Sequence, residues 1–396
     1  MNEKILAFPK TDLHLHLDGS VRVSTIIDLA KQGKISLPSY TEAGLNELVF
    51  KDQYSSLVDY LKGFQYTVPL MQTPENLERI SYELAWDNLN EGVCYLEVRY
   101  APQLHVNENQ GFDQVLMSVA RGMDRAKAEY NSKPEVKNGT LPPFNYGIIV
   151  CAMRAFGKGF SKCFDAFLET HKYSDDDYIF SVASLELVKA CVKIRNEHNV
   201  PIVAFDLAGA EEGHPASVHK GSFHLARKSL MHVTVHAGEA YGAESIFQAV
   251  TDLYAERIGH GFHLFSEDRL QAESIRDKRK YIDNLVRFIA NSRTTIEVCL
   301  TSNLQTIPQL GNLQNHPFRK MLEAKISTTL CTDNRTVSKT TVTQEVHHAI
   351  KNFNLTTDQV KEILMAGFEQ SFYPGSYTEK QQFIQKVRNR FAALGH

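Results

Sequence analysis

The chain has 396 residues, of which 43% are hydrophobic and 22% are charged, a globular balance that excludes extensive disorder. Its net charge of -3 offers no broad attraction for nucleic acid or for an anionic membrane, so we expect a small-molecule partner. The sequence holds no apolar run of the ~18 residues that a membrane span needs, and its opening, MNEKILAFPKTD, does not resemble a signal peptide, which predicts a cytoplasmic protein. Six scattered cysteines without a CxxC pair indicate buried free thiols.

Short β-branched runs alternate with helical stretches along the whole chain, a pattern typical of repeated strand-then-helix units. Eight runs closing a parallel sheet predict an α/β fold of the TIM-barrel type, (β/α)8, in one domain spanning residues 1–396. The runs lie near Thr11–Leu17, Val93–Tyr100, Tyr146–Cys151, Ile202–Leu207, His232–His236, Arg257–His260, Thr295–Leu300 and Ser327–Cys331.

Three other segments carry predictions of their own. The stretch from Val21 to Leu70 is too long for one crossover, and we expect it to add helices over the C-terminal mouth of the barrel. The segment Asn131–Pro143, which is rich in proline and glycine, predicts an exposed loop. The tail Thr357–Leu394 predicts helix, broken around Tyr373–Ser376 by Pro374 and Gly375.

Two histidines stand at alternate positions of the first run, in TDLHLHLDGS. Because side chains two apart on a strand point to the same face, His14 and His16 can reach one metal ion. The alternative is a pair of polar residues facing solvent, but Leu13, Leu15 and Leu17 occupy the opposite face, so both faces of this strand need a buried environment.

Ionisable groups also end three later runs, where a TIM barrel places its functional groups. They are His236 and Glu239 in VTVHAGEAYG, His260 in ERIGHGFHLF and Asp333 in TTLCTDNRT. Each alone has a structural explanation, such as a helix cap or a buried hydrogen bond. Together, His14, His16, His236 and Asp333 form an N3O donor set that suits zinc and leaves a position for water. Glu239 and His260 remain to handle protons.

These residues lie within motifs that resemble the adenosine deaminase family, the metal-dependent purine nucleoside deaminases of the amidohydrolase superfamily. HLHLDGS, CAMR, DLAG, HAGE, RIGHG, TSN and TDN occur in the family's order between about Thr11 and Asn334. The resemblance implies a (β/α)8 barrel that holds one Zn²⁺ per chain and activates water for attack on purine C6. It predicts deamination of adenosine or deoxyadenosine to the corresponding inosine with release of ammonia.

The resemblance also implies roles for single residues. Glu239 protonates purine N1, His260 orients or deprotonates the water, and Asp333 binds the metal and the attacking hydroxide. The substrate contacts implied are those of His16, of Asp18 with the ribose 5'-hydroxyl, of the Gly209 amide with purine N3, of Asn334 with N7, of Met153 in CAMR, and of a lid face made by Leu57, Tyr60, Leu61 and Phe64. The simpler readings are a helix cap for Asp18, a turn glycine for Gly209 and a core stripe for the lid face.

Several positions depart from the family's pattern and concern the substrate more than the reaction. Asn334 stands where many members have a second aspartate, although its amide can still donate to N7. Ala210, Ala155 and Leu300 replace an acid, a histidine and a proline respectively. The stretch AEEGHPASVHKGSF is unusually long, and we predict a solvated loop. No lysine ends the fourth run, so a second, carboxylate-bridged metal has no candidate ligand there.

Three classes of function are therefore open. Besides adenosine, the substrate could be a modified adenine nucleoside such as aminodeoxyfutalosine, N6-methyl-AMP or a 5'-modified adenosine. A different metal-dependent hydrolysis on the same barrel is the second class, because fold and metal do not fix the chemistry. A binding protein without activity is the third, and the presence of every ligand and both proton carriers disfavours it. The sequence does not indicate the oligomeric state, the regulation or the metal bound in the cell.

Overall fold

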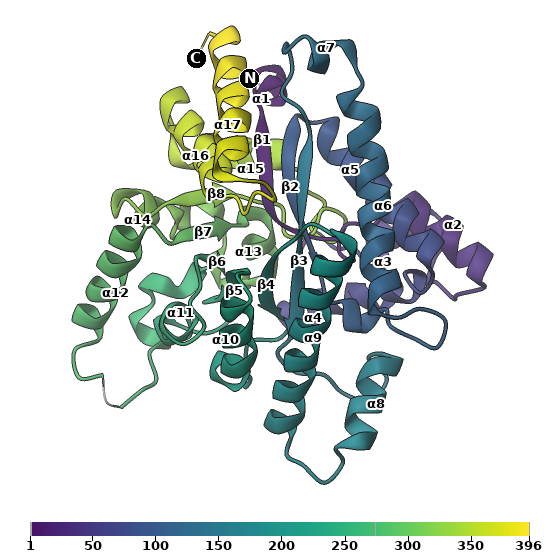
Figure 1. The fold of residues 1–396 in the computed structure, drawn as a ribbon. Coiled ribbons are helices and arrows are strands. Elements are labelled where there is room, and N and C mark those ends of the chain that lie inside the picture. Colours follow the sequence, from purple (N-terminus) through teal and green to yellow (C-terminus); the bar gives the residue numbers. More distant parts are fainter. Residues whose placement is uncertain (1, 274, 396) are drawn as a thin grey trace.

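The computed structural model describes residues 2–273 and 275–395, and eight parallel strands form its centre (Figure 1). They pair in chain order around one sheet. The strands are β1 Lys10–His16, β2 Val93–Tyr100, β3 Asn145–Met153, β4 Ile202–Ala208, β5 His232–Ala237, β6 Arg257–His260, β7 Thr295–Val298 and β8 Thr328–Leu330. The predicted eight-stranded α/β barrel is thereby confirmed.

The last strand returns to the first and brings the sheet close to a complete barrel. Leu15 and Asp333 form a parallel bridge. The His16 amide donates to the Asp333 carbonyl at 2.8 Å, and the Asp333 amide donates to the His14 carbonyl at the same distance. The functional ends of the first and eighth strands are therefore fixed to each other by backbone hydrogen bonds.

Burial on both faces explains why these runs become strands of a parallel sheet. Every residue of β1, β2 and β4 is buried, polar ones included. The helices surround the strands and close the ends of the barrel: α1 Asn2–Ala7, α2 Val23–Gly33, α3 Glu42–Leu48, α4 Leu57–Leu61, α5 Pro74–Leu89, α6 Phe112–Asn131, α7 Pro134–Lys137, α8 Lys162–Thr170, α9 Asp176–His198, α10 Lys220–Lys228, α11 Ala243–Thr251, α12 Lys278–Ser292, α13 Leu300–Thr306, α14 Phe318–Glu323, α15 Val342–Phe353, α16 Thr357–Glu369 and α17 Tyr377–Ala393.

The two ends of the barrel are closed by different parts of the chain. At the carboxyl ends of the strands lie α4 and the 3-10 helix η1, Lys62–Tyr66, which belong to the segment predicted to cover the mouth. At the amino ends lies the tail, whose Phe372 amide donates to Glu97 of β2 at 2.5 Å. The first and last helices of the described chain, α1 and α17, also lie at this second end (Figure 1).

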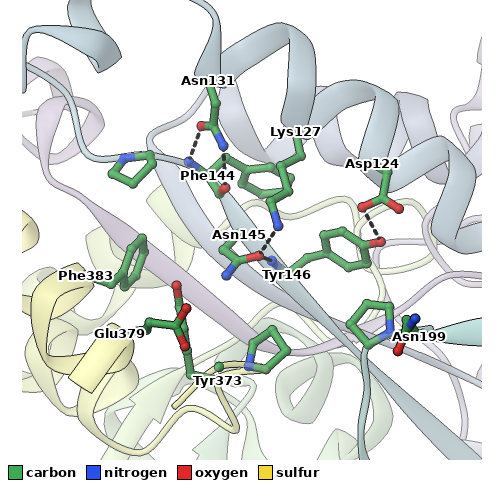
Figure 2. Close-up of a pocket in the computed structure, with 14 residues that line it drawn as sticks. Asp124, Lys127, Asn131, Phe144, Asn145, Tyr146, Asn199, Tyr373, Glu379 and Phe383 are labelled. Atoms are coloured by element: carbon green, nitrogen blue, oxygen red, sulfur yellow. Dashed lines mark hydrogen bonds between the residues drawn. The ribbon is translucent and has the colours of Figure 1, made fainter. Parts of the chain in front are cut away.

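A polar groove of about 460 Å³ opens at the amino ends of the strands, remote from the mouth (Figure 2). Its polar side chains largely bond to one another. Lys127 donates to Asn145 at 2.7 Å, Tyr146 donates to Asp124 at 2.8 Å, and Asn131 is tied to the Phe144 backbone through both its amide atoms. The catalytic chemistry of a barrel belongs to the other end of the strands.

Local details differ from the sequence predictions in two places. The segment Asn131–Pro143 is largely exposed as predicted, but Pro134 starts the one-turn helix α7 within it. The seventh run ends as a strand at Val298, and Leu300 already begins α13. The break between α16 and α17 lies where proline and glycine predicted it. All six cysteines are free, and all but the partly buried Cys163 are buried. In the described part of the chain no helix is long and apolar enough to cross a membrane.

Candidate active site at the barrel mouth

A small cavity of about 40 Å³ lies at the carboxyl ends of the strands and collects most of the predicted site residues. Its polar wall comes from β1, β5, β6 and the residues after β8, whereas its outer wall is apolar. The lining residues are His16, Leu57, Tyr60, Leu61, Phe64, Ala208, Gly209, His236, Glu239, His260, Asp333 and Asn334. His14 lies directly beneath, with its ring centre 4.5 Å from that of His236 and 4.9 Å from that of His260.

Two buried carboxylates orient the imidazoles of His14 and His236. His14 Nδ1 lies 2.8 Å from Glu297 of β7, and His236 Nδ1 lies 3.0 Å from Asp206 of β4. A carboxylate on Nδ1 holds the proton there and leaves Nε2 with a free lone pair. His14 Nε2 is fully buried and has no hydrogen-bond partner among the described residues. A buried imidazole nitrogen in that state is suited to a metal ion.

Four side chains can hold a divalent metal together. His14, His236, His260 and Asp333 each offer one ligand atom, and these atoms all lie within 4.8 Å of one another. His16 lies next to this set without being one of its four members; its Nε2 is 3.1 Å from His236 Nε2 and 3.5 Å from Asp333 Oδ1. The structure thus brings three of the four ligands expected from the sequence, His14, His236 and Asp333, together with His260, and places His16 beside them.

A chain of hydrogen bonds determines where the proton of His260 lies. The Phe318 amide donates to His316 Nδ1 at 3.0 Å, so neutral His316 carries its proton on Nε2. That Nε2 contacts Asn303 Oδ1 at 3.1 Å, and Asn303 Nδ2 in turn donates to His260 Nδ1 at 3.1 Å. Burial lowers the pKa of His316 to about 3 and keeps it neutral. His260 Nδ1 is therefore an acceptor, and neutral His260 carries its proton on Nε2, facing the cavity.

Asp333 is held in place by backbone geometry and by a serine. Ser302 donates to its Oδ2 at 2.6 Å. Asp333 and His260 both adopt positive φ angles, 61° and 66°, in which few residues other than glycine are found. Burial by itself would raise the pKa of Asp333, but the imidazoles of His14, His260 and His16 hold it well below its usual range, so this carboxylate is ionised.

Glu239 is a buried acid of the opposite character. Its Oε1 is 3.6 Å from His260 Nε2, and its carboxyl group accepts no hydrogen bond from the described residues. Burial raises its pKa well above the usual value, and the negative charges of Asp333 and Glu211 raise it further. A carboxyl group that keeps its proton at neutral pH next to an ionised carboxylate can serve as a proton donor.

Most, but not all, of the residues predicted to contact the substrate line the cavity. Leu57, Tyr60, Leu61 and Phe64 all lie on the outer wall, and Asn334 donates to the Tyr60 hydroxyl at 2.8 Å. Gly209 has a φ of +98°, and a β-carbon there would lie 3.2 Å from Met153. Within the described part of the chain, Asp18 and Met153 are not among the residues that line the cavity. Asp18 is nevertheless buried, has an Oδ1 atom without a hydrogen bond, and has a pKa raised by burial to about 7.

Several residues that lie behind the site and support it were not predicted from the sequence. Asp206 and Glu297 are acidic residues within otherwise apolar strands, and this contrast is the signal in the sequence that could have identified them as functional. Arg99 lies between them, donating to Asp206 at 3.0 Å and to Glu297 at 2.8 Å. Asn303 lies in the TSN motif, but nothing in the sequence connects it with His316. One prediction was wrong: the stretch after DLAG is not a solvated loop, because Glu211 and His219 within it are buried.

Comparison with known proteins identifies the family to which the chain belongs. The family model described as adenosine deaminase matches residues 9–390. The chain belongs to the adenosine deaminase family. The adenosine deaminase of Vibrio atlanticus is 35% identical to it over 367 residues, which are 93% of this chain and 94% of that protein. As an adenosine deaminase family member, the chain is a deaminase-type hydrolase whose substrate is a purine.

Solved structures share the fold of this adenosine deaminase family member at lower identity. An amidohydrolase from Burkholderia ambifaria with bound zinc has a TM-score of 0.76 at 17% identity, covering 100% of this chain and 93% of that one. The N6-mAMP deaminase of Arabidopsis has a TM-score of 0.73 at 23% identity, covering 98% of this chain and 99% of that one. Family membership gives the class of reaction, whereas the choice among purines depends on the residues around the cavity.

Proposed function

We propose that the protein hydrolyses the 6-amino group of adenosine and deoxyadenosine, adding water at C6 and releasing ammonia. Glu239 carries this proposal. It is a buried acid, its pKa is raised well above the usual value, and it lies beside the cluster of imidazoles and Asp333. Water adds to C6 of a purine more readily when N1 takes up a proton, and Glu239 is the group at the cavity that has one to give.

The metal we propose is one zinc ion per chain, held by His14, His16, His236 and Asp333. A zinc ion held there would lower the pKa of its bound water to about 7 and so supply a nucleophile at neutral pH. The carboxylates behind His14 and His236 support these two ligands, because a ligating imidazole usually donates its other N–H to such a partner. His260 has the reverse arrangement, with an amide donor on Nδ1, which favours a role outside the ligand set.

The remaining steps use the side chains around the cavity. His260, with its proton on Nε2, donates a hydrogen bond to the attacking oxygen and orients it toward C6. Asp333 is ionised and accepts the proton that this oxygen gives up. Glu239 delivers its proton to N1, and the amino group leaves as ammonia after taking up the proton held by Asp333. As the C6 carbonyl forms, the hydrogen that remains on the added oxygen leaves and restores the proton of Glu239, so one water is consumed and one ammonia is released.

Three residues at or near the cavity would recognise the substrate. The Gly209 amide can meet N3, because the absence of a side chain lets the purine approach the backbone. The amide of Asn334 can donate its second hydrogen to N7. The Oδ1 atom of Asp18, which has no hydrogen-bond partner among the described residues, suits the 5'-hydroxyl of a ribose, whereas a 5'-phosphate would bring negative charge against a buried carboxyl group that is itself partly ionised at neutral pH. These contacts favour a nucleoside over a free base or a nucleotide.

The cavity of about 40 Å³ is far smaller than a nucleoside needs. Binding therefore requires α4 and η1 to move outward and close again over the purine. Leu57, Leu61 and Phe64 would then cover its apolar surface and exclude water.

A panel of purines measured by kcat/KM tests the proposal. The panel holds adenosine, deoxyadenosine, adenine, N6-methyl-AMP, aminodeoxyfutalosine and a 5'-modified adenosine. We expect adenosine and deoxyadenosine to rank highest. A preference for N6-methyl-AMP would contradict the role of Asp18, and a preference for adenine would contradict nucleoside recognition. Inactivity toward every member, in zinc-loaded protein, would refute the proposed substrate class.

The chain from residue 1 to 396 would act as one deaminase domain. A non-enzymatic role is disfavoured because the ligand cluster, an ionised carboxylate and a protonated one occupy the same cavity.

A further inference from the structure

One carboxylate outside the cavity holds the loop that carries Glu239. Glu211 is buried, with 2% of its surface exposed. Its Oε1 accepts from the Gly238 amide at 2.9 Å, and its Oε2 accepts from the amides of Glu239, Ala240 and Tyr241 at 3.0, 2.7 and 3.0 Å. A single side chain thus satisfies four consecutive backbone N–H groups.

The loop needs such an acceptor because of its shape. Gly238 has a φ of +73°, which turns the chain sharply after β5 and directs successive amides to one side. Those amides lie before the first turn of α11, where no helical carbonyl can accept from them. Without a partner they would be buried donors, which cost free energy. Ser245, in the first turn of α11, donates to Glu211 as well, and so connects the loop with the helix that follows.

The other side of the same loop is anchored by Arg154, which follows β3. Its Nη2 donates to the His236 carbonyl at 2.5 Å and lies 4.0 Å from Glu211 Oε1. The segment from His236 to Tyr241 is therefore fixed from two sides: the guanidinium of Arg154 binds a carbonyl at its start, and the carboxylate of Glu211 binds the amides that follow. Arg154 and Glu211 are both buried, and Glu239, which belongs to the segment they fix, lines the cavity.

We propose that Glu211 is a positioning residue for the reaction: its carboxylate fixes the backbone of residues 238–241 and thereby sets the carboxyl of Glu239 against the purine ring. This inference rests on the proposed role of Glu239 as proton donor. Glu211 does not line the cavity in the described part of the chain, so its effect on turnover passes through the loop. Its charge-assisted hydrogen bonds are of the strong kind, and a carboxylate is the one side chain that can accept all of them.

Replacement by glutamine tests the inference with the smallest change of shape. In Glu211→Gln an NH2 group takes the place of one oxygen and faces amide hydrogens instead of accepting from them. Glu212→Gln is the matched control, because Glu212 is the adjacent residue and is exposed. Zinc content, thermal midpoint, kcat and KM for adenosine, and hydrogen exchange of the peptide covering residues 238–241 are measured for both variants and the wild type.

We expect Glu211→Gln to keep its zinc and to lower kcat roughly 10- to 100-fold with KM changed less than about threefold, because a misplaced proton donor slows the chemical step. Exchange of the amides of residues 238–241 should rise roughly tenfold or more, with distant peptides unchanged. Glu212→Gln should match the wild type in all measurements. Normal kcat per zinc-loaded site together with a lowered thermal midpoint would mean that Glu211 is merely structural, and would overturn the proposal.

A second variant keeps the test decisive if Glu211→Gln does not fold. Ser245→Ala removes one of the five hydrogen bonds, and we expect the same pattern at smaller size, a few-fold lower kcat and faster exchange in residues 238–241. Unchanged exchange there would contradict the proposal. Hydrogen exchange needs no substrate, so a wild type without activity on any purine would refute the proposed function while the hold of Glu211 on the loop is still measured.

Discussion

Replacing Glu239 by glutamine separates proton donation from every other property of the site. The two side chains have nearly the same shape, and the carboxyl group of Glu239 accepts no hydrogen bond from the described residues, so the change breaks none. It also removes a buried ionisable group with a strongly raised pKa, which predicts an unchanged or slightly higher thermal midpoint. The variant should therefore fold and bind zinc as the wild type does.

The expected loss is that of general acid catalysis. The glutamine amide can donate a hydrogen bond to N1 but cannot transfer a proton, so kcat should fall about 10²- to 10⁴-fold, which corresponds to roughly 3–5 kcal/mol in the activation free energy. KM should change little, because the hydrogen bond to the ground-state purine survives. In the wild type, activity should decline as the pH rises through the raised pKa of Glu239 and its proton is lost.

The assay is the change in ultraviolet absorbance as adenosine becomes inosine, with zinc measured in each preparation. The wild type and Glu212→Gln serve as controls for folding and for general handling. Turnover within about threefold of the wild type in zinc-loaded Glu239→Gln would refute the reasoning. A fall in zinc content would instead place Glu239 in the ligand set.

Three further predictions concern the metal, the lid and the dependence of stability on pH. His16→Ala should lose zinc, whereas His260→Ala should retain zinc and have a lower kcat, because His260 Nδ1 accepts a hydrogen bond from an amide. Zinc analysis of the two variants tests this prediction, and the reverse result would exchange the roles of the two histidines. Phe64→Ala, on the outer wall, should raise KM several-fold by exposing the purine to water, and an unaltered KM would remove η1 from the substrate site. Burial raises the pKa of Asp12 from its usual 3.8 to about 7. Between these pH values the folded protein keeps a proton on Asp12 that the unfolded chain has lost. The free energy of unfolding therefore falls as the pH rises from about 4 to about 7. In urea titrations, the free energy of unfolding of Asp12→Asn minus that of the wild type should therefore increase from pH 5 to pH 8, by on the order of a few kcal/mol at most. An equal difference between the two proteins at both pH values would contradict this prediction.

The sequence predicted the site as far as strand geometry determines it. Alternation along β1 placed His14 and His16 on one face, and the rule that barrel chemistry lies at the carboxyl ends of strands brought His236, His260 and Asp333 to the same mouth. The ring centres of His14 and His16 are 5.4 Å apart, as the alternation requires. Periodicity and the turn residues were sufficient for this part of the prediction.

The rest depends on contacts between distant segments that no local pattern encodes. Glu297 meets His14 across 283 positions, and the Asn303 amide, not the spacing of motifs, determines the proton on His260. The sequence analysis placed Glu211 in a stretch predicted to be a solvated loop. It is buried because four amides of another loop need an acceptor, a requirement that appears only when the two loops lie together.

The most direct test of the central claim is the ultraviolet assay on purified, zinc-loaded protein mixed with adenosine, run beside a sample treated with a chelator. We predict rapid conversion to inosine in the first sample, none in the second, and recovery when zinc is restored. Conversion that continues at the same rate after verified removal of the metal would contradict the account, and so would a zinc-loaded protein that leaves adenosine unchanged.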